Sequence, residues 1–244
     1  SFFPVWFALS APLGLASAAD PTPEQQYWLE RINRMRADPA GELDRLVNFD
    51  APGVWSATKS DDPVVAAALN FFNTSASTLQ AQWNTLQPAP ALAWSSALAA
   101  SSVTYSNLMV ANDAQSHTLD GKSFDQRIID GGYTPNYLDV AESLFAATQS
   151  VNHGHSAFAI DWGDDDANPG NGYGTGIQSP AEHRNVMMDP LLKEIGIGFQ
   201  SIAIPGSNTV ADGPLVVTQH FGSQYRYTGS VFVADAIITG SVYD

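Results

Sequence analysis

The chain has 244 residues, and its hydrophobic fraction of 44% is enough for one large domain with end segments. Its formal net charge is −15. Because this acidic surplus repels the phosphates of nucleic acids and anionic lipids, neither is expected as a general partner. The sequence contains no cysteine, which excludes a disulfide framework, a thiolate metal site and a cysteine nucleophile.

The first segment is an apolar stretch over residues 2–15, followed by Ala16-Ser17-Ala18. Small residues at this spacing after an apolar run are typical of a signal peptidase site. Pro4 and Pro12 interrupt the stretch, and it is too short to span a membrane comfortably. We therefore interpret residues 1–19 as a signal peptide or an apolar N-terminal segment. The expected location is secreted, extracellular or at the cell surface, without an integral membrane span.

The rest of the chain is predicted to be helices followed by strands. A helical pattern opens at Pro23 and ends at Asp38-Pro39, with Arg31, Arg34 and Arg36 expected to face solvent. Ser95 is the expected N-cap of the strongest helix. The remaining helices are predicted over 42–47, 64–72, 77–85, 95–112, 124–129, 156–162 and 180–188, and 140–146 is predicted as a helix or a buried segment. Strands are predicted over 194–199, 215–218 and 230–233.

Helices first and strands last, without regular βαβ alternation, predict an α+β fold. We expect residues 20–228 to form the domain and residues 229–244 to form a C-terminal strand segment. The apolar run over 237–242 has no obvious hairpin partner, and an unpaired strand seeks a free edge. Self-association through the terminal segments is therefore a further expectation.

Four short motifs hold the residues best suited to chemistry. They are Ser116-His117 with Asp120-Gly121, Ala141-Glu142-Ser143, Glu182-His183-Arg184, and Thr218-Gln219-His220-Phe221-Gly222. Their order and surroundings resemble the bacterial branch of the CAP superfamily, which comprises cysteine-rich secretory proteins, antigen 5 and pathogenesis-related proteins. The resemblance runs from about Glu24 to Gly222 and includes Asn33-Arg34-Met35-Arg36, Pro90–Leu98, Gly132-Tyr133 and Ile195–Gly198.

This resemblance implies an α-β-α sandwich around a small, mostly antiparallel sheet, and a cleft that gathers two histidines and two acids. Carried over motif by motif, three of these residues are His117, Glu142 and His183. The fourth is Asp161, which lies between Glu142 and His183 as that acid should, and Glu182 is its competitor. In secreted bacterial relatives a strand like the one in residues 229–244 often opens a further β module.

Two imidazoles with one or two carboxylates can hold a divalent metal such as zinc, or they can activate a water molecule. The sequence thus predicts zinc at His117, His183 and Glu142. The leading hypothesis is a binding protein for a divalent metal, a small ligand or an extracellular protein surface. One alternative is a metal-assisted or water-based hydrolase of peptide or ester bonds. The other is an adhesion or assembly module with an inactive cleft.

Two further patterns offer metal ligands. Asp164, Asp166 and Asn168 carry hard oxygens suited to calcium, but Pro169 and Thr175 stand where an EF-hand needs glycine and glutamate. A solvated acidic loop is the preferred interpretation there. His153-Gly154-His155 has the i, i+2 spacing of two ligands on one strand face, but it is interpreted as a surface turn.

Overall fold

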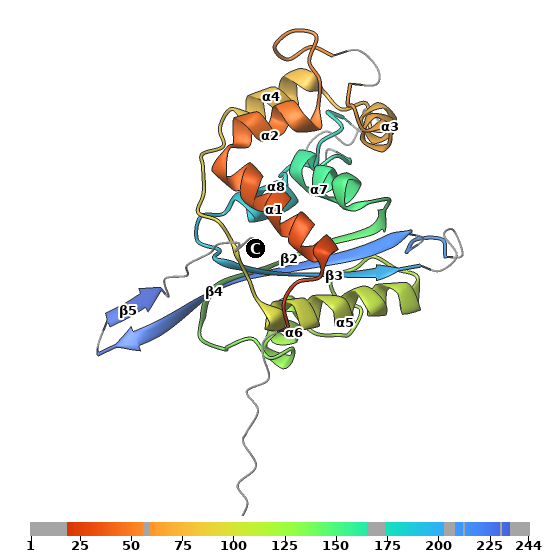
Figure 1. Ribbon diagram of the computed structural model, residues 1–244. Helices are drawn as coiled ribbons and strands as arrows, with labels where there is room; N and C mark the ends of the chain where they lie inside the picture. Colours follow the sequence, from red (N-terminus) through yellow and green to blue (C-terminus); the bar gives the residue numbers. More distant parts are fainter. Residues whose placement is uncertain are drawn as a thin grey trace, which may run out of the picture.

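The computed structural model describes residues 19–55, 59–164, 174–202, 208–211, 213–229 and 231–234. A sheet lies between two helical layers (Figure 1). Its strands follow the order β1 (Ala93–Trp94), β3 (Glu194–Ser201), β4 (Leu215–Thr228) and β2 (Tyr137–Thr148). Strand β1 is parallel to β3, and the β3–β4 and β4–β2 pairs are antiparallel. The predicted α-β-α sandwich with a mostly antiparallel sheet is confirmed.

A short ribbon extends from one end of the sheet. Strand β5 (Val231–Ala234) pairs with residues Tyr225–Thr228 of β4, outside the part of β4 that pairs with β2 and β3. Figure 1 shows this ribbon projecting from the body of the molecule. The apolar run over 237–242 lies outside the described residues, and the expected boundaries of the domain and the self-association of its ends stay predictions.

One helical layer consists of α5 (Ser96–Asn112) and α6 (Phe124–Asp130), and it lies directly against the sheet. Gly196 and Gly198 of β3 face α5, because a Cβ atom at either position would overlap the main chain of Leu98–Ala99 or Ser102–Val103. Ser102 and Ser106 of α5 donate hydrogen bonds to the carbonyls of these two glycines. Glycine at alternate positions therefore sets the close approach of α5 to β3.

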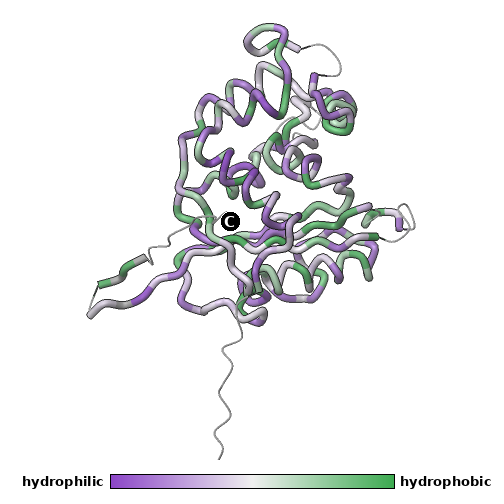
Figure 2. Tube along the Cα trace, viewed as in Figure 1, coloured by the Kyte–Doolittle hydropathy of each residue, from purple (hydrophilic) through white to green (hydrophobic). Residues whose placement is uncertain are grey.

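The other layer contains the remaining helices: α1 (Pro23–Ala37), α2 (Pro39–Leu46), α3 (Pro63–Phe71), α4 (Ala76–Trp83), α7 (Val151–Ile160) and α8 (Glu182–Met188). The largest apolar cluster joins these helices to the sheet, with Trp28, Ile32 and Met35 of α1 fully buried. Figure 2 shows hydrophobic residues recurring along the strands between the two layers. Within the described ranges, none of the helices has the length and hydrophobicity that a bilayer crossing requires.

Local sequence sets where several helices begin. Helices α1, α2 and α3 each have proline in the first turn, where the missing N–H costs no hydrogen bond. Asp38 ends α1 and also caps α2 by accepting from the Gly41 amide. Ser95 caps α5 as predicted, accepting from the Leu98 amide.

The prediction that Arg36 faces solvent is wrong, because this residue is fully buried. Its guanidinium donates to the carbonyl oxygens of Pro90 at 2.6 Å, Met187 at 2.6 Å and Leu192 at 3.2 Å. One turn earlier, the Asn33 amide pairs with both the N–H and the C=O of Leu92. The Asn-x-x-Arg element thus binds main-chain groups that arrive from distant loops, a role that helical periodicity does not reveal.

The segment 140–146, predicted as a helix or a buried segment, is not a helix and forms the centre of strand β2. Leu144 and Ala146 pack with α5, while Phe145 packs against the opposite layer. A strand covered on both faces is apolar at successive positions and loses the alternation that distinguishes a strand from a buried helix.

The His153-Gly154-His155 motif lies in helix α7 and both histidines are buried, so the predicted surface turn is wrong. His155 Nε2 lies 2.9 Å from Glu42 Oε1, and Arg34 also binds the Glu42 carboxylate. His155 and Glu42 are 113 residues apart in sequence, which is why no local pattern predicted a buried partner for this histidine.

Candidate functional site

Glu142, on the edge strand β2, is the centre of a charged cluster. Its Oε1 lies 2.7 Å from His117 Nδ1, and its Oε2 lies 2.7 Å from His220 Nε2. Arg127 of α6 also binds Oε2. Glu142 and His220 are directly opposite in the β2–β4 register, so the sheet itself sets their contact. Three side chains from three elements therefore occupy both carboxylate oxygens.

The loop that carries His117 is held by α5 and α6. Tyr105 of α5 donates its hydroxyl to the Ser116 carbonyl at 2.5 Å. The guanidinium carbon of Arg127 lies 3.5 Å from the centroid of the Tyr105 ring. Arg127 also binds the Asp120 carboxylate through Nε and Nη2, and it donates to the His117 carbonyl at 2.9 Å. The imidazole of His117 is consequently fixed at its base while its side chain stays 55% exposed.

The electrostatics keep Glu142 ionised. Burial alone would raise its pKa, but hydrogen bonds from His117 and His220 and the charge of Arg127 lower it to about 2. An ionised carboxylate only accepts hydrogen bonds, so His117 donates through Nδ1, and in the neutral form of the ring Nε2 is then the acceptor. Both oxygens already accept hydrogen bonds, and the bond at Oε1 orients His117.

The second pair consists of Asp161 and His183. Asp161 follows α7 in the left-handed region, with φ 59° and ψ 45°, and its buried carboxylate accepts from His183 Nδ1 at 2.7 Å. The same carboxylate accepts from the His183 amide at 2.9 Å, which holds the first turn of α8. Glu182, the competitor for this role, is exposed. The side chain of His183 is 21% exposed.

The two pairs belong to opposite faces of the sheet. Glu142 shares its face with Leu144, which packs against α5. On the other face, the His183 ring packs against Phe158 with ring centroids 5.2 Å apart. Phe158 in turn packs against Phe145 of β2, with ring centroids 6.2 Å apart. Strand β2 is the edge strand, and α6 and α8 both pack against it. Among the described residues no hydrogen bond joins one pair to the other.

Both pairs nevertheless share one chemical arrangement. In each, a buried carboxylate accepts from Nδ1 of a partly exposed imidazole, an arrangement that leaves Nε2 free to accept when the ring is neutral. Histidines that bind metals commonly donate their other ring nitrogen to a carboxylate in this way. The structure also adds two residues that the sequence prediction did not assign a role, Arg127 and His220. His220 stands in the fourth motif, but only the strand register reveals that it contacts Glu142.

The described part of the chain contains no group of three or more His, Cys, Asp or Glu side chains arranged to hold a metal ion. Of the predicted calcium ligands, Asp164 is exposed, whereas Asp166 and Asn168 lie outside the described residues. The zinc and calcium sites therefore stay predictions, and any zinc site would depend on the two imidazoles.

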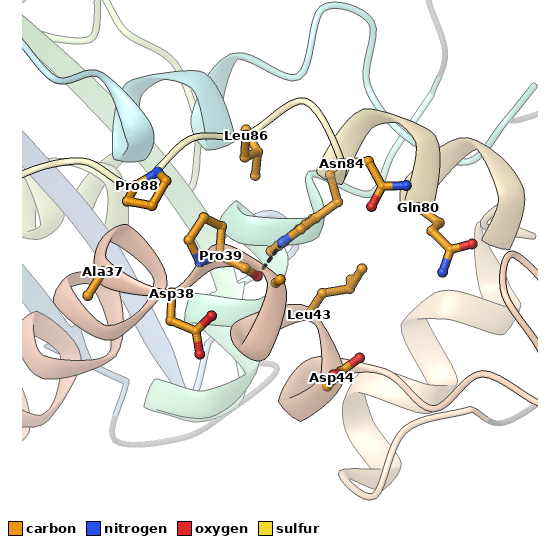
Figure 3. Close-up of a pocket in the computed structure, with 11 residues that line it drawn as sticks. Ala37, Asp38, Pro39, Leu43, Asp44, Gln80, Asn84, Leu86 and Pro88 are labelled. Carbon is orange, nitrogen blue, oxygen red and sulfur yellow. Dashed lines mark hydrogen bonds between the residues drawn. The ribbon is translucent and has the colours of Figure 1, made fainter.

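A cavity of about 360 Å³ lies elsewhere, between the end of α1, helix α2 and helix α4 (Figure 3). Asp38, Leu43, Gln80 and Trp83 are among its lining residues. The Trp83 indole donates to the Pro39 carbonyl at 2.5 Å inside this region. None of the lining residues belongs to either histidine pair, so we do not assign the cavity to the candidate site.

Acid is expected to destabilise the fold in two stages. Burial lowers the pKa of His153 from 6.5 to about 4. Between these pH values the His153 imidazole is therefore protonated in the unfolded chain but neutral in the folded chain. This stage removes up to about 3 kcal/mol as pH falls to 4. Glu142 and Glu42, both with a pKa of about 2, stabilise the fold above pH 4.5, and this contribution is lost as pH falls towards 2. Urea unfolding from pH 8 to pH 3 measures the first stage and the onset of the second.

The histidine stage has its own control. A phenylalanine side chain does not titrate, so His153→Phe should reduce the pH dependence of the unfolding free energy between pH 6.5 and 4. Part of the dependence should persist, because burial also lowers the pKa values of His155 and His220. An unchanged slope in that window would refute the assignment to His153.

Comparison with known proteins agrees with the family inferred from the motifs. The model of the CAP (cysteine-rich secretory protein) family matches residues 29–221. Among solved structures, an outer surface protein from Borrelia burgdorferi is similar with a TM-score of 0.39 and 15% identity, over 67% of this chain and 94% of that one. Venom allergen-like protein 4 from Schistosoma mansoni gives 0.35 and 12%, over 64% and 85%. No curated protein sequence matches at a significant level.

The fold and the site define a three-layer α+β domain with two carboxylate–histidine pairs at the edge of its sheet. The chain belongs to the CAP family, as the match over most of its length shows. The resemblance inferred from the motifs is thereby confirmed.

Proposed function

We propose that this CAP domain binds a divalent metal ion such as zinc through Nε2 of His117 and Nε2 of His183. The observation that carries the proposal is the matched pair of carboxylate–histidine contacts, each at 2.7 Å through Nδ1. Such contacts fix the tautomer and the orientation of an imidazole ligand. Glu142 and Asp161 then act as orienting partners, whereas the sequence prediction made Glu142 a direct ligand.

The donor set fits a weak site rather than a tight structural one. Closed structural zinc sites use four protein ligands, and here two imidazoles would bind the ion across the edge of β2. When bound, the ion would supply positive charge for a carboxylate, a phosphate or a surface partner. Metal binding is one of the three roles that the leading hypothesis gave the site, beside binding of a small ligand or of a protein surface. A secreted location is proposed with it, supported by the apolar run and the small-x-small pattern within residues 1–19.

Zinc titration by calorimetry tests the proposal. We expect one ion per chain, with at least tenfold weaker affinity in His117→Ala and in His183→Ala. Asp161→Asn should also weaken binding by roughly 10–100-fold, because the amide no longer enforces the Nδ1–H tautomer. Binding should fade at acid pH, since protons compete for the imidazole nitrogens. Asp164→Asn, at an exposed acid outside both pairs, is the matched control and should bind zinc like the wild type.

The double variant decides whether the histidines share an ion. For a shared ion, His117→Ala/His183→Ala should lose little more affinity than either single variant, because each alone already breaks the site. Two ions per chain with additive losses would contradict a shared site, and wild-type affinity in the double variant would remove the proposal altogether. Turnover of peptide or ester substrates that depends on the same histidines would favour the hydrolase alternative.

A further inference from the structure

His220 is a fully buried histidine in the middle of β4 that the proposed site leaves without a role. Its Nε2 lies 2.7 Å from Glu142 Oε2. In the sheet register it stands directly opposite Glu142 on one side and Gly196 on the other. A polar ring at such a place costs free energy unless it is hydrogen-bonded, and the contact with Glu142 supplies the partner of Nε2.

The protonation states define the direction of this bond. Burial lowers the pKa of His220, and the ionised Glu142 can only accept hydrogen bonds. His220 therefore donates its Nε2–H to Oε2. Arg127 binds the same oxygen from α6.

These two donors hold one end of the carboxylate from two different elements. Arg127 cannot adjust freely, because its other nitrogens are bonded to Asp120 and to the His117 carbonyl. His220 is fixed by the sheet, and α5 closes over that face because Gly196 has no side chain. With Oε2 held by two rigid donors, Oε1 is directed at His117 Nδ1.

We propose that His220 is a positioning residue: together with Arg127 it orients Glu142 so that His117 is kept in the Nδ1–H tautomer with Nε2 facing outward. The role in cation binding rests on the proposed function, but the effect on the tautomer does not. An imidazole tautomer follows the hydrogen bond that its other nitrogen makes. Loosening Glu142 should thus release His117 to the Nε2–H form, which cannot bind a metal through that atom.

Nitrogen-15 NMR of the imidazoles at pH 8 tests this inference without any metal. Wild-type His117 is expected in the Nδ1–H tautomer. His220→Phe fills the same space without a donor and should produce a clear rise in the Nε2–H fraction of His117. His220→Gln places an amide donor near the former Nε2 and should restore the wild-type tautomer. Zinc affinity should fall about tenfold in the phenylalanine variant and recover in the glutamine variant.

A second buried histidine provides the matched control. His155 is also fully buried and also contacts a buried glutamate, through Nε2 at 2.9 Å from Glu42, but it lies in the other layer. His155→Phe should lower stability and leave the His117 tautomer unchanged. If His220→Phe does not fold, His220→Asn, whose shorter amide does not reach Oε2, takes its place.

The outcomes separate this inference from the proposed function. If His220→Phe alters the His117 tautomer but neither the wild type nor any variant binds zinc, the role of His220 is supported and the metal site is refuted. A folded His220→Phe or His220→Asn protein that keeps the wild-type His117 tautomer would overturn the inference, and so would an equal change in His155→Phe.

Discussion

Gly196→Ala is expected to destabilise the domain by about 3 kcal/mol or more, which corresponds to a melting temperature lower by roughly 6–12 °C. The new Cβ would overlap the main-chain nitrogen of Ala99 and the carbonyl carbon of Leu98. Main-chain atoms in α5 cannot rotate away, so the whole helix must lift from β3. Thermal and urea unfolding followed by circular dichroism measure the loss.

Two controls separate this clash from other effects of replacing a glycine. Gly121 has φ +70°, but no heavy atom lies within 4 Å of the place that a Cβ would take there. Gly121→Ala therefore tests backbone strain alone and should cost about 1–2 kcal/mol. Adding Ala99→Gly to Gly196→Ala should not rescue stability, because the overlap is with main-chain atoms. Wild-type stability in Gly196→Ala would show that α5 does not lie this close to β3.

Arg36→Met is expected to cost about 3–5 kcal/mol, because three carbonyl oxygens lose their donor and a buried acceptor left unpaired costs about 1–3 kcal/mol. The guanidinium binds three carbonyl oxygens, from Pro90, Met187 and Leu192. Methionine fills much of the space but leaves all three acceptors without this donor. Because Met187 is in α8, the same change should also disturb the helix that carries His183. Urea unfolding measures the loss.

Arg31→Met on the same helix is the control, since Arg31 is partly exposed and exposed charges contribute little. It should change the unfolding free energy by less than about 1 kcal/mol. Arg36→Lys should remain strongly destabilised, because one ammonium group cannot reproduce a planar fork with three separate acceptors. Equal losses in Arg31→Met and Arg36→Met would contradict the structural role given to Arg36.

The carboxylate–histidine contacts differ in how far the histidine ring is exposed to solvent. Glu42–His155 is wholly enclosed, so its histidine cannot reach a ligand and serves to join α2 to α7. Glu142–His117 and Asp161–His183 have buried acids but partly exposed rings. Among the described contacts of this kind, these two pairs can offer an imidazole nitrogen to solvent, and this difference in exposure separates the candidate site from the core.

The sequence alone determined the features that depend on neighbours along the chain. Proline and polar caps at Asp38 and Ser95 located helix boundaries, and the order of helices and strands predicted the α+β class. The ordered motifs around His117, Glu142 and His183 identified the family, because each motif is short and continuous.

Tertiary structure decided which of these residues meet. His220 contacts Glu142 across 78 residues and His155 contacts Glu42 across 113, and neither distance in sequence leaves a local pattern. The burial of Arg36, the strand at 140–146 and the division of the four predicted residues into two pairs follow from strand register and from helices covering both faces of the sheet. Periodicity describes one element at a time, whereas these contacts arise only when the layers pack together.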